Sequence, residues 1–442
     1  MTESVVILGG GLSGLIAADI CSQLGIDSIL IEKTNILGGG NKSIKDKDGN
    51  VFDYGYHTLD YNRSFLTTKY FEKVLKNNFR KFKLCRGIVI KNYIIPYNEN
   101  LSKWPIELRK LLKTNLPTDT IQGRLNRNTI SKIYGKKFTE FAFDEILNSY
   151  PSIKWSIRNG GNEEDFFGLI YPWFFPKTNK NKPRTSEWDQ FHDQMRQNLD
   201  HYVLYPKSNG FQGFMDAIIK DIDRNYCKIR KNIKNIEFKI NPKTKDIQEI
   251  KINNNTISGN LFFWCSSPIA LSRILNIDLN EGKLGKPQKI IFGNFVLEKE
   301  IKSKFHEILV GSLDHKINRI SFPGKISKKQ DNLVQVEYSF PDKQFEMDKN
   351  FWKKSWIKSL KELEILKHDN KIKKFTIVEE TRGFVSKYNW EFLTNMYKEK
   401  ILKSKGKNLI VPSFNIGPEN INRVIPDVIL NTVNSLYQLN RK

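Results

Sequence analysis

Residues 5–20 read VVILGGGLSGLIAADI, and this stretch constrains the possible folds more than any other part of the sequence. The apolar run at 5–8 predicts a buried parallel strand, and the segment after the glycines has helical spacing and ends at Gly25. A second apolar run follows and ends at Glu32, eighteen residues beyond Gly14. A strand, a glycine-rich turn, a helix and a second strand in this order predict a Rossmann-like α/β domain that binds a dinucleotide.

Each residue of this turn has a physical role in such a site. Gly9 permits a tight turn, Gly11 lets the backbone approach a pyrophosphate, and Gly14 lets the helix lie close to the sheet. The helix N-terminus presents N–H groups and a positive dipole to the phosphates, and Glu32 can accept hydrogen bonds from the ribose hydroxyls. The alternative is a glycine-rich turn in an unrelated sheet. The expected contacts in this segment are Gly9, Gly11, Leu12, Ser13, Gly14, Glu32 and Lys33.

A second glycine cluster, ILGGGN, follows at residues 36–41. Together, GGGLSGL, ILIEK and LGGGNKS resemble the N-terminus of the flavoprotein clan that holds amine oxidases, protoporphyrinogen oxidases, carotenoid desaturases and UDP-galactopyranose mutases. The resemblance implies that the dinucleotide is FAD rather than NAD, with Gly39, Gly40 and Asn41 near the phosphates and the flavin. Lys42 stands close to the place where the clan often has an arginine.

Later segments resemble other parts of the same clan. Residues 49–62, GNVFDYGYHTLDYN, resemble a strand that leads towards the flavin, which implies that His57 lies near the isoalloxazine. The alternative is that His57 bonds a loop carbonyl. The resemblance also implies that Ile233 and Ser266 lie along the dinucleotide and that residues 408–436 supply the closing FAD segment. The expected contacts of that closing segment are Gly417, Asn420 and Ile421.

Aromatic and basic residues elsewhere are the candidates for substrate binding. Residues 87–98 resemble a hairpin that opens the substrate domain in clan members of surface-glycan pathways. The cluster at 169–191 combines aromatic residues with a basic loop, and residues 375–392 lie where the clan's chain returns to the cofactor. The alternatives are ordinary aromatic packing, a solvated loop, and a surface arginine paired with Glu379 or Glu380. The substrate candidates are Tyr97, Tyr171, Trp173, Lys177, Arg184 and Trp390, and the catalytic candidates are His57, Arg382 and Tyr388.

The chain has 442 residues, enough for two or three intertwined units. The expected fold class is α/β, with a Rossmann-like FAD-binding domain and an inserted mixed-sheet (α+β) substrate domain. The FAD-binding domain is expected at residues 1–86, 205–284 and 401–442, and the substrate domain at 87–204 and 285–400.

The amino-acid composition of the chain limits the kinds of partner that the protein can bind. The net charge is +24, from 72 Lys and Arg against 48 Asp and Glu, which fits either an anionic partner or a lysine-rich composition throughout. We expect a small-molecule substrate, and a nucleotide sugar is one candidate. We expect no nucleic-acid partner, because no nucleic-acid motif is present. The four cysteines lack C-x-x-C spacing, so we expect no metal site and a reduced, cytoplasmic protein. Apolar runs are too short for a membrane span, and both peripheral membrane contact and the oligomeric state stay open.

Three functions are compatible with these patterns. The first is an FAD-dependent oxidoreductase that acts on an anionic or glycan-related small molecule. The second is a mutase like UDP-galactopyranose mutase, which would isomerise a nucleotide sugar with reduced FAD. The third is a flavin-bound protein without catalytic activity.

Overall fold

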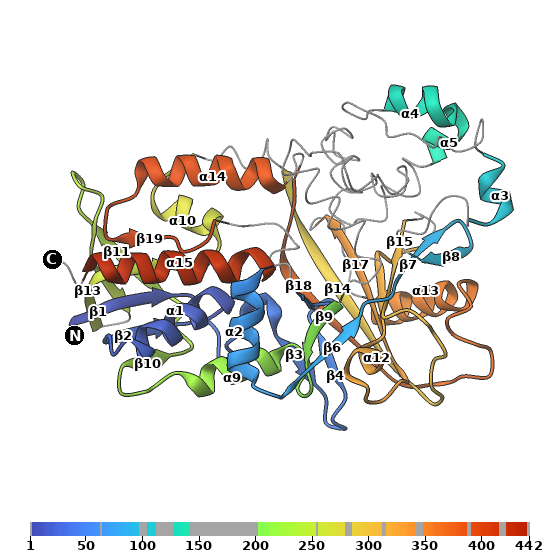
Figure 1. Ribbon diagram of the computed structural model, residues 1–442, viewed down its shortest axis with the longest axis horizontal. Helices are drawn as coiled ribbons and strands as arrows, with labels where there is room; N and C mark the ends of the chain where they lie inside the picture. Colours follow the sequence, from blue (N-terminus) through green and yellow to red (C-terminus); the bar gives the residue numbers. More distant parts are fainter. Residues whose placement is uncertain are drawn as a thin grey trace. The chain divides into compact units, whose positions relative to one another are not determined.

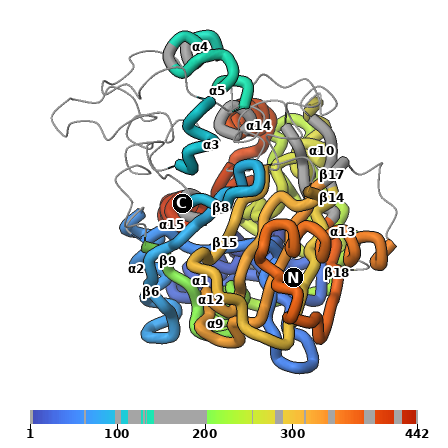
Figure 2. The backbone as a smooth tube through the Cα atoms, turned by 90° about the vertical axis from the view of Figure 1, so that its right-hand side faces the viewer, coloured from blue at the N-terminus to red at the C-terminus, as the bar shows by residue number. Residues whose placement is uncertain are grey.

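The computed structural model describes residues 2–61, 64–96, 104–111, 127–141, 202–252, 255–278, 285–311, 315–341, 348–386, 390–414 and 421–439. The chain divides into two compact units (Figures 1 and 2). The first unit combines Met1–Lys81, Leu204–Glu281 and Trp390–Lys442, and the second combines Phe82–Val203 and Gly282–Asn389. The assignment of FAD binding to residues 1–86, 205–284 and 401–442, and of substrate binding to residues 87–204 and 285–400, stays a prediction.

The first unit is built on a sheet of order β10-β2-β1-β13-β12-β11, with β19 added beside β13. Strands β10, β2, β1, β13 and β19 are parallel to one another, whereas β12 pairs antiparallel with both β13 and β11. The side chains of Val5, Val6 and Ile7 have no exposed surface, as expected for a parallel strand covered on both faces. The sheet strands are β1 (Thr2–Leu8), β2 (Ser28–Ile31), β10 (Cys227–Arg230), β11 (Ile236–Ile240), β12 (Ile247–Ile252), β13 (Asn255–Trp264) and β19 (Leu409–Ile410).

Helices cover this sheet. Helix α1 (Leu12–Gln23) directly follows β1 and contacts α15 (Ile421–Leu439), and Figure 1 shows the two running along the sheet. The unit also holds helices α2 (Phe65–Leu75), α9 (Gln212–Asp221), α10 (Pro268–Ile274) and α14 (Trp390–Ser404) and the short helix η1 (Gly39–Asn41). A two-stranded sheet pairs β3 (Ser43–Lys45) with β4 (Val51–Asp53), and a further sheet of order β5-β9-β6 joins Leu59–Asp60, Tyr202–Pro206 and Phe79–Lys83.

The second unit is built on a mixed sheet of order β18-β14-β17-β16-β15-β7-β8. Only the pair of β15 with β7 is parallel among the pairings described for this sheet. The strands are β7 (Arg86–Ile90), β8 (Tyr93–Pro96), β14 (Gly285–Leu297), β15 (Glu307–Val310), β16 (Arg319–Ser321), β17 (Leu333–Pro341) and β18 (Ile372–Ser386), and the helices are α3 (Ile106–Arg109), α4 (Arg127–Tyr134), α5 (Lys136–Phe141), α12 (Pro323–Ser327) and α13 (Lys349–Glu362).

One face of this mixed sheet carries the hydrophobic core. Trp352 and Trp356 of α13 are buried in the same cluster as Phe295 and Val336 of the sheet. A side chain at Gly293 would place its Cβ 2.3 Å from the Trp356 ring, so the indole can pack here only because this strand position is glycine. The expected fold class, a Rossmann-like α/β domain with a separate mixed-sheet domain, is confirmed.

The sequence of residues 130–155 has a helical pattern and predicts a helix there, and the structure has α4 and α5 in this stretch, which end at Phe141. The rest of that prediction lies outside the described residues. In the described parts of the chain, no helix has the length and apolar character needed to cross a membrane.

Candidate functional site

The turn between β1 and α1 is fixed by glycines with different tasks. Gly9 has a φ of +111°, which favours glycine, and a Cβ there would lie 2.8 Å from the Cys265 carbonyl oxygen. A Cβ at Gly14 would lie 1.8 Å from the Gly9 oxygen, so helix and strand could not approach as they do. Gly11 differs, because its Cβ would meet only the Gly39 Cα, at 3.8 Å. The first two positions therefore shape the turn, whereas the third is not required by the packing of the turn and would accept a Cβ without a clash.

The second glycine cluster lies against the first. The Gly38 N–H donates to the Gly10 carbonyl over 2.8 Å, and Gly11 and Gly38 form an isolated parallel bridge. A Cβ at Gly39 would be 3.1 Å from the Gly11 Cα, and a Cβ at Gly40 would meet nothing within 4 Å. The two clusters predicted to serve one ligand are thus brought together, with open space at Gly40.

Glu32 lies at the end of β2 and faces the same turn. Its Oε2 accepts the Gly10 N–H over 2.7 Å, and its Oε1 accepts the Thr34 N–H and hydroxyl, each over 2.8 Å. The Ile233 N–H donates to the Glu32 backbone carbonyl over 3.1 Å, so Ile233 is next to the predicted ribose position. Lys33, the residue after Glu32, is exposed.

These residues fit a dinucleotide. The first turn of α1, which contains Leu12 and Ser13, has no side-chain cap and no acidic residue, so its N–H groups are available to an anion. Gly11 and Gly40 allow a ligand to approach the backbone closely, because an added Cβ would meet one atom at 3.8 Å at Gly11 and nothing within 4 Å at Gly40. The Glu32 carboxylate lies beside them, bonded to the Gly10 N–H. Ser266 is exposed just beyond β13, and its backbone nitrogen would be 3.3 Å from a Cβ at Gly9.

A buried carboxylate holds the segment that leads to His57. Asp53 at the end of β4 accepts the Ser43 hydroxyl over 2.6 Å, the Phe211 N–H over 2.9 Å and the Tyr205 hydroxyl over 2.7 Å. Burial raises its pKa to about 6, although these three donors act in the opposite direction. Asp53 therefore joins β3, β4, β9 and the start of α9. Sequence reasoning missed this role, although FDYGYH contained the residue.

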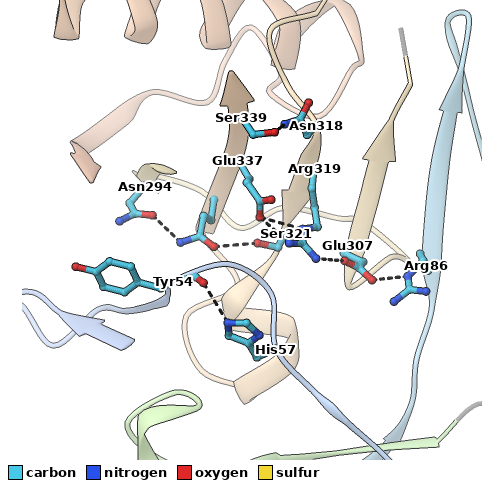
Figure 3. Close-up of polar contacts among 11 residues, drawn as sticks. Tyr54, His57, Arg86, Asn294, Glu307, Asn318, Arg319, Ser321, Glu337 and Ser339 are labelled. Carbon is cyan, nitrogen blue, oxygen red and sulfur yellow. Dashed lines mark hydrogen bonds and ion pairs between the residues drawn. The ribbon is translucent and has the colours of Figure 1, made fainter. Parts of the chain in front are cut away.

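His57 itself makes the contact that we considered as the alternative. Its Nε2 lies 3.1 Å from the Tyr54 carbonyl oxygen (Figure 3), and its ring centroid is 5.7 Å from that of Phe211. Lys42, the residue noted for standing in place of arginine, holds its Nζ 4.2 Å from the Tyr54 ring centroid. The proximity of His57 to a flavin, and any catalytic role, stay predictions.

The pKa of Asp53 predicts a pH-dependent stability. Because the folded pKa of about 6 lies above the ordinary value of 3.8, the stabilising contribution is complete below about pH 4 and is lost as pH rises through about 6. Its size is roughly 2–3 kcal/mol. Urea unfolding should show that the free energy of unfolding of the wild type falls, relative to that of Asp53→Asn, as the pH rises from about 4 to 7. A difference that does not change with pH would contradict this assignment.

The second unit carries a buried polar face on its mixed sheet. Gln335, Glu337 and Ser339 alternate along β17 with the apolar residues of the core, yet each is less than a tenth exposed. The Gln335 Nε2 donates to the Asn294 Oδ1 over 2.9 Å, and the Asn318 amide donates to the Ser339 hydroxyl over 2.6 Å (Figure 3). Polar alternation in this strand therefore marks a buried polar surface.

A charge ladder crosses four neighbouring strands on this face (Figure 3). Arg86 on β7 bonds through Nε to Glu307 on β15, whose other oxygen lies 3.5 Å from the Arg319 Nη1 on β16. The Arg319 Nη2 donates to Glu337 on β17 over 2.6 Å. The Glu307 side chain has no exposed surface, whereas Arg86 and Arg319 are 24% and 25% exposed. The ladder is neutral in sum, and its cations are the members that reach the surface.

Several predicted site residues lie in elements whose side chains are not described there, or outside the described residues. Arg382 lies in β18, Trp390 begins α14 and Ile421 begins α15, and nothing is described of their side chains. Glu379, considered as a partner of Arg382, forms an ion pair with Lys289 at 3.0 Å. The predicted residues outside the described ranges are Tyr97, Tyr171, Trp173, Lys177, Arg184, Tyr388, Gly417 and Asn420. Among the described residues, no three His, Cys, Asp or Glu side chains form a group suited to a metal ion.

Comparison with known proteins supports the class that this turn defines. Residues 7–73 match the family described as "NAD(P)-binding Rossmann-like domain". The chain is 42% identical over 53 residues to 15-cis-phytoene desaturase of Narcissus pseudonarcissus, a stretch that spans 12% of this chain and 9% of that protein. The first unit therefore contains a dinucleotide-binding Rossmann-like domain.

Similarity in structure extends over the whole chain. A crystal structure of reduced UDP-galactopyranose mutase has a TM-score of 0.67 and 13% identity, and the match covers 99% of each chain. A putative protoporphyrinogen oxidase from Exiguobacterium has a TM-score of 0.70 and 12% identity, and the match covers 100% of this chain and 99% of that one. The chain thus has the fold of these flavoproteins, and the resemblance drawn from the sequence is confirmed at that level.

Proposed function

We propose that this chain binds FAD in its first unit and is an FAD-dependent oxidoreductase for an anionic small molecule. One observation carries the proposal: the two glycine clusters meet at Gly11 and Gly39, beside an uncapped helix N-terminus and Glu32. A single cluster would serve many dinucleotides. The second cluster, with open space at Gly40, supports the longer contact that FAD requires.

The chain's own residues would hold the cofactor by its diphosphate and ribose. N–H groups in the first turn of α1 would bind the diphosphate oxygens, with the helix dipole adding to the attraction. Glu32 would keep the Gly10 N–H and use its remaining lone pairs to accept hydrogen bonds from the ribose hydroxyls. FAD, when bound, supplies the hydride-accepting chemistry, and the protein supplies binding and orientation.

The polar face of the second unit supports an anionic substrate. Arg86 and Arg319 are partly exposed on an otherwise buried face, and carboxylates hold both guanidinium groups in place, Glu307 that of Arg86 and Glu337 with Glu307 that of Arg319. Such anchored forks suit a carboxylate or a phosphate, because less rotamer freedom is lost when the anion binds. The net charge of +24 would further raise the local concentration of an anion.

The alternative function is a mutase that acts on a nucleotide sugar without net oxidation. The observation that favours it is the match to reduced UDP-galactopyranose mutase over nearly the full length of both chains. A nucleotide diphosphate would also suit a pair of arginines. The two functions differ in the flavin state that they need, because a mutase acts with reduced flavin and an oxidase with oxidised flavin.

A flavin titration tests both functions. The purified protein should show flavin absorbance, and anaerobic addition of a panel of anionic amines, alcohols and sugars should bleach it for at least one compound. Perturbation of the flavin spectrum by UDP-galactose mainly after dithionite reduction would instead support the mutase. A colourless protein that does not take up added FAD would contradict both proposals.

A further inference from the structure

Cys85 and His306 hold each other immediately before β7 and β15 begin to pair. The Cys85 N–H donates to the His306 Nδ1 over 2.9 Å, and the His306 N–H donates to the Cys85 carbonyl over 2.7 Å. The two residues are 221 positions apart in the sequence. We name this pair of hydrogen bonds the Cys85–His306 clasp.

The clasp lies where the strand register is set. β7 and β15 are parallel, with Arg86 opposite Glu307, so no hairpin turn fixes how they align. A slip by one residue would move Arg86 from the polar face of the sheet to the face that carries the core. The residues of the clasp directly precede Arg86 and Glu307, so the clasp fixes the alignment of the first rungs of the charge ladder.

The side-chain half of the clasp requires a neutral imidazole. A ring nitrogen that accepts a backbone N–H carries no proton, so in this arrangement the proton of His306 is on Nε2. The Phe82 ring, 4.8 Å from the imidazole between centroids, holds the ring from one side, and the Phe322 N–H donates to the His306 carbonyl over 3.0 Å. Protonation at Nδ1 would set two donors against each other and remove the bond.

The charges around the clasp are mostly positive. Lys83 on β6, Lys304 in the preceding loop and Lys325 on α12 act electrostatically on Cys85. Arg86 and Glu307, which flank the clasp on β7 and β15, are bonded to each other. A further positive charge on His306 would therefore meet three lysines, while the neighbouring carboxylate is already engaged.

We propose that His306 is a positioning residue whose neutral ring keeps Arg86 in register with Glu307, so that the ladder is assembled only while the ring is unprotonated. The consequence for an anionic substrate rests on the proposed function, whereas the alignment itself does not. Acidification would loosen the start of β7 and withdraw the Arg86 guanidinium from the polar face.

Hydrogen exchange at the Cys85 amide tests the proposal, with His306→Asn and His306→Leu as matched variants. Asparagine offers a carboxamide oxygen near the position of Nδ1 and does not titrate, whereas leucine offers no acceptor. At about pH 7.5, protection of this amide, corrected for intrinsic exchange, should be retained in His306→Asn and fall about fivefold to tenfold in His306→Leu. Between about pH 7.5 and 5 the wild type should lose this protection and His306→Asn should keep it.

Binding of inorganic pyrophosphate to protein saturated with FAD, so that the diphosphate site at α1 is filled, is measured by calorimetry and separates this proposal from the proposed function. If the wild type binds it, His306→Leu should bind about tenfold more weakly and His306→Asn as the wild type does. If the wild type does not bind it while the amide behaves as described, the anion-binding role of Arg86 is contradicted and the positioning role stands. Equal protection of the Cys85 amide in all three proteins, or a wild type indifferent to acid, overturns the proposal.

Discussion

A Gly11→Val variant should fold normally and lose its dinucleotide. Gly11 has φ −77° and ψ −171°, a conformation open to any residue, and its Cβ would meet only the Gly39 Cα, at 3.8 Å. The branched methyl groups of valine would then extend into the space that a pyrophosphate needs. We expect affinity for FAD to fall at least a hundredfold, which corresponds to about 2.7 kcal/mol.

Two further variants at glycines make this result specific. Gly11→Ala adds less volume and should lose less affinity than Gly11→Val, which gives a graded series at one position. Gly14→Ala would place its Cβ 1.8 Å from the Gly9 oxygen, so it should destabilise the fold before it affects binding. Flavin absorbance per mole of purified protein and the Kd for added FAD measure binding, and urea unfolding measures stability. A Gly11→Val protein that retains full flavin would show that the phosphates bind elsewhere.

The N-terminal site could be predicted from the sequence because its parts are local. The strand, the glycine turn, the helix and Glu32 lie within one short stretch, and each has its own sequence signature. Even the second glycine cluster follows within a few residues of Glu32. The contact between Gly38 and Gly10 therefore adds geometry to an assignment that the pattern already indicated.

The polar groups that connect distant segments could not be predicted in this way. Asp53 meets Tyr205 across 152 positions, and Arg86 meets Glu307 across 221. Alternating polar residues in a strand such as β17 ordinarily indicate a solvated face. Only the order of strands in the sheet reveals that Glu337 faces Arg319 and is buried, and that order depends on pairings between segments far apart in the chain.

Removal of Arg319 should cause a large loss of stability. Arg319→Met would leave the buried carboxylate of Glu337 without its partner and Glu307 with Arg86 alone. Truncating one member of a buried ion pair typically costs about 3–5 kcal/mol, because the remaining charge stays out of water. Guanidinium unfolding followed by tryptophan fluorescence should show this loss at neutral pH, since Trp352 and Trp356 lie in the core of the same unit.

Two controls identify the cause of that loss as uncompensated charge. The double variant Arg319→Met/Glu337→Gln restores neutrality across the ladder, so it should recover most of the stability lost by the single variant. Lys299→Met breaks the Lys299–Asp369 pair, whose side chains are 57% and 65% exposed, and should cost less than about 1 kcal/mol. Equal losses in the single and the double variant would mean that the unpaired charge of Glu337 is not the cause of the lost stability, and this role of the charge ladder would be contradicted.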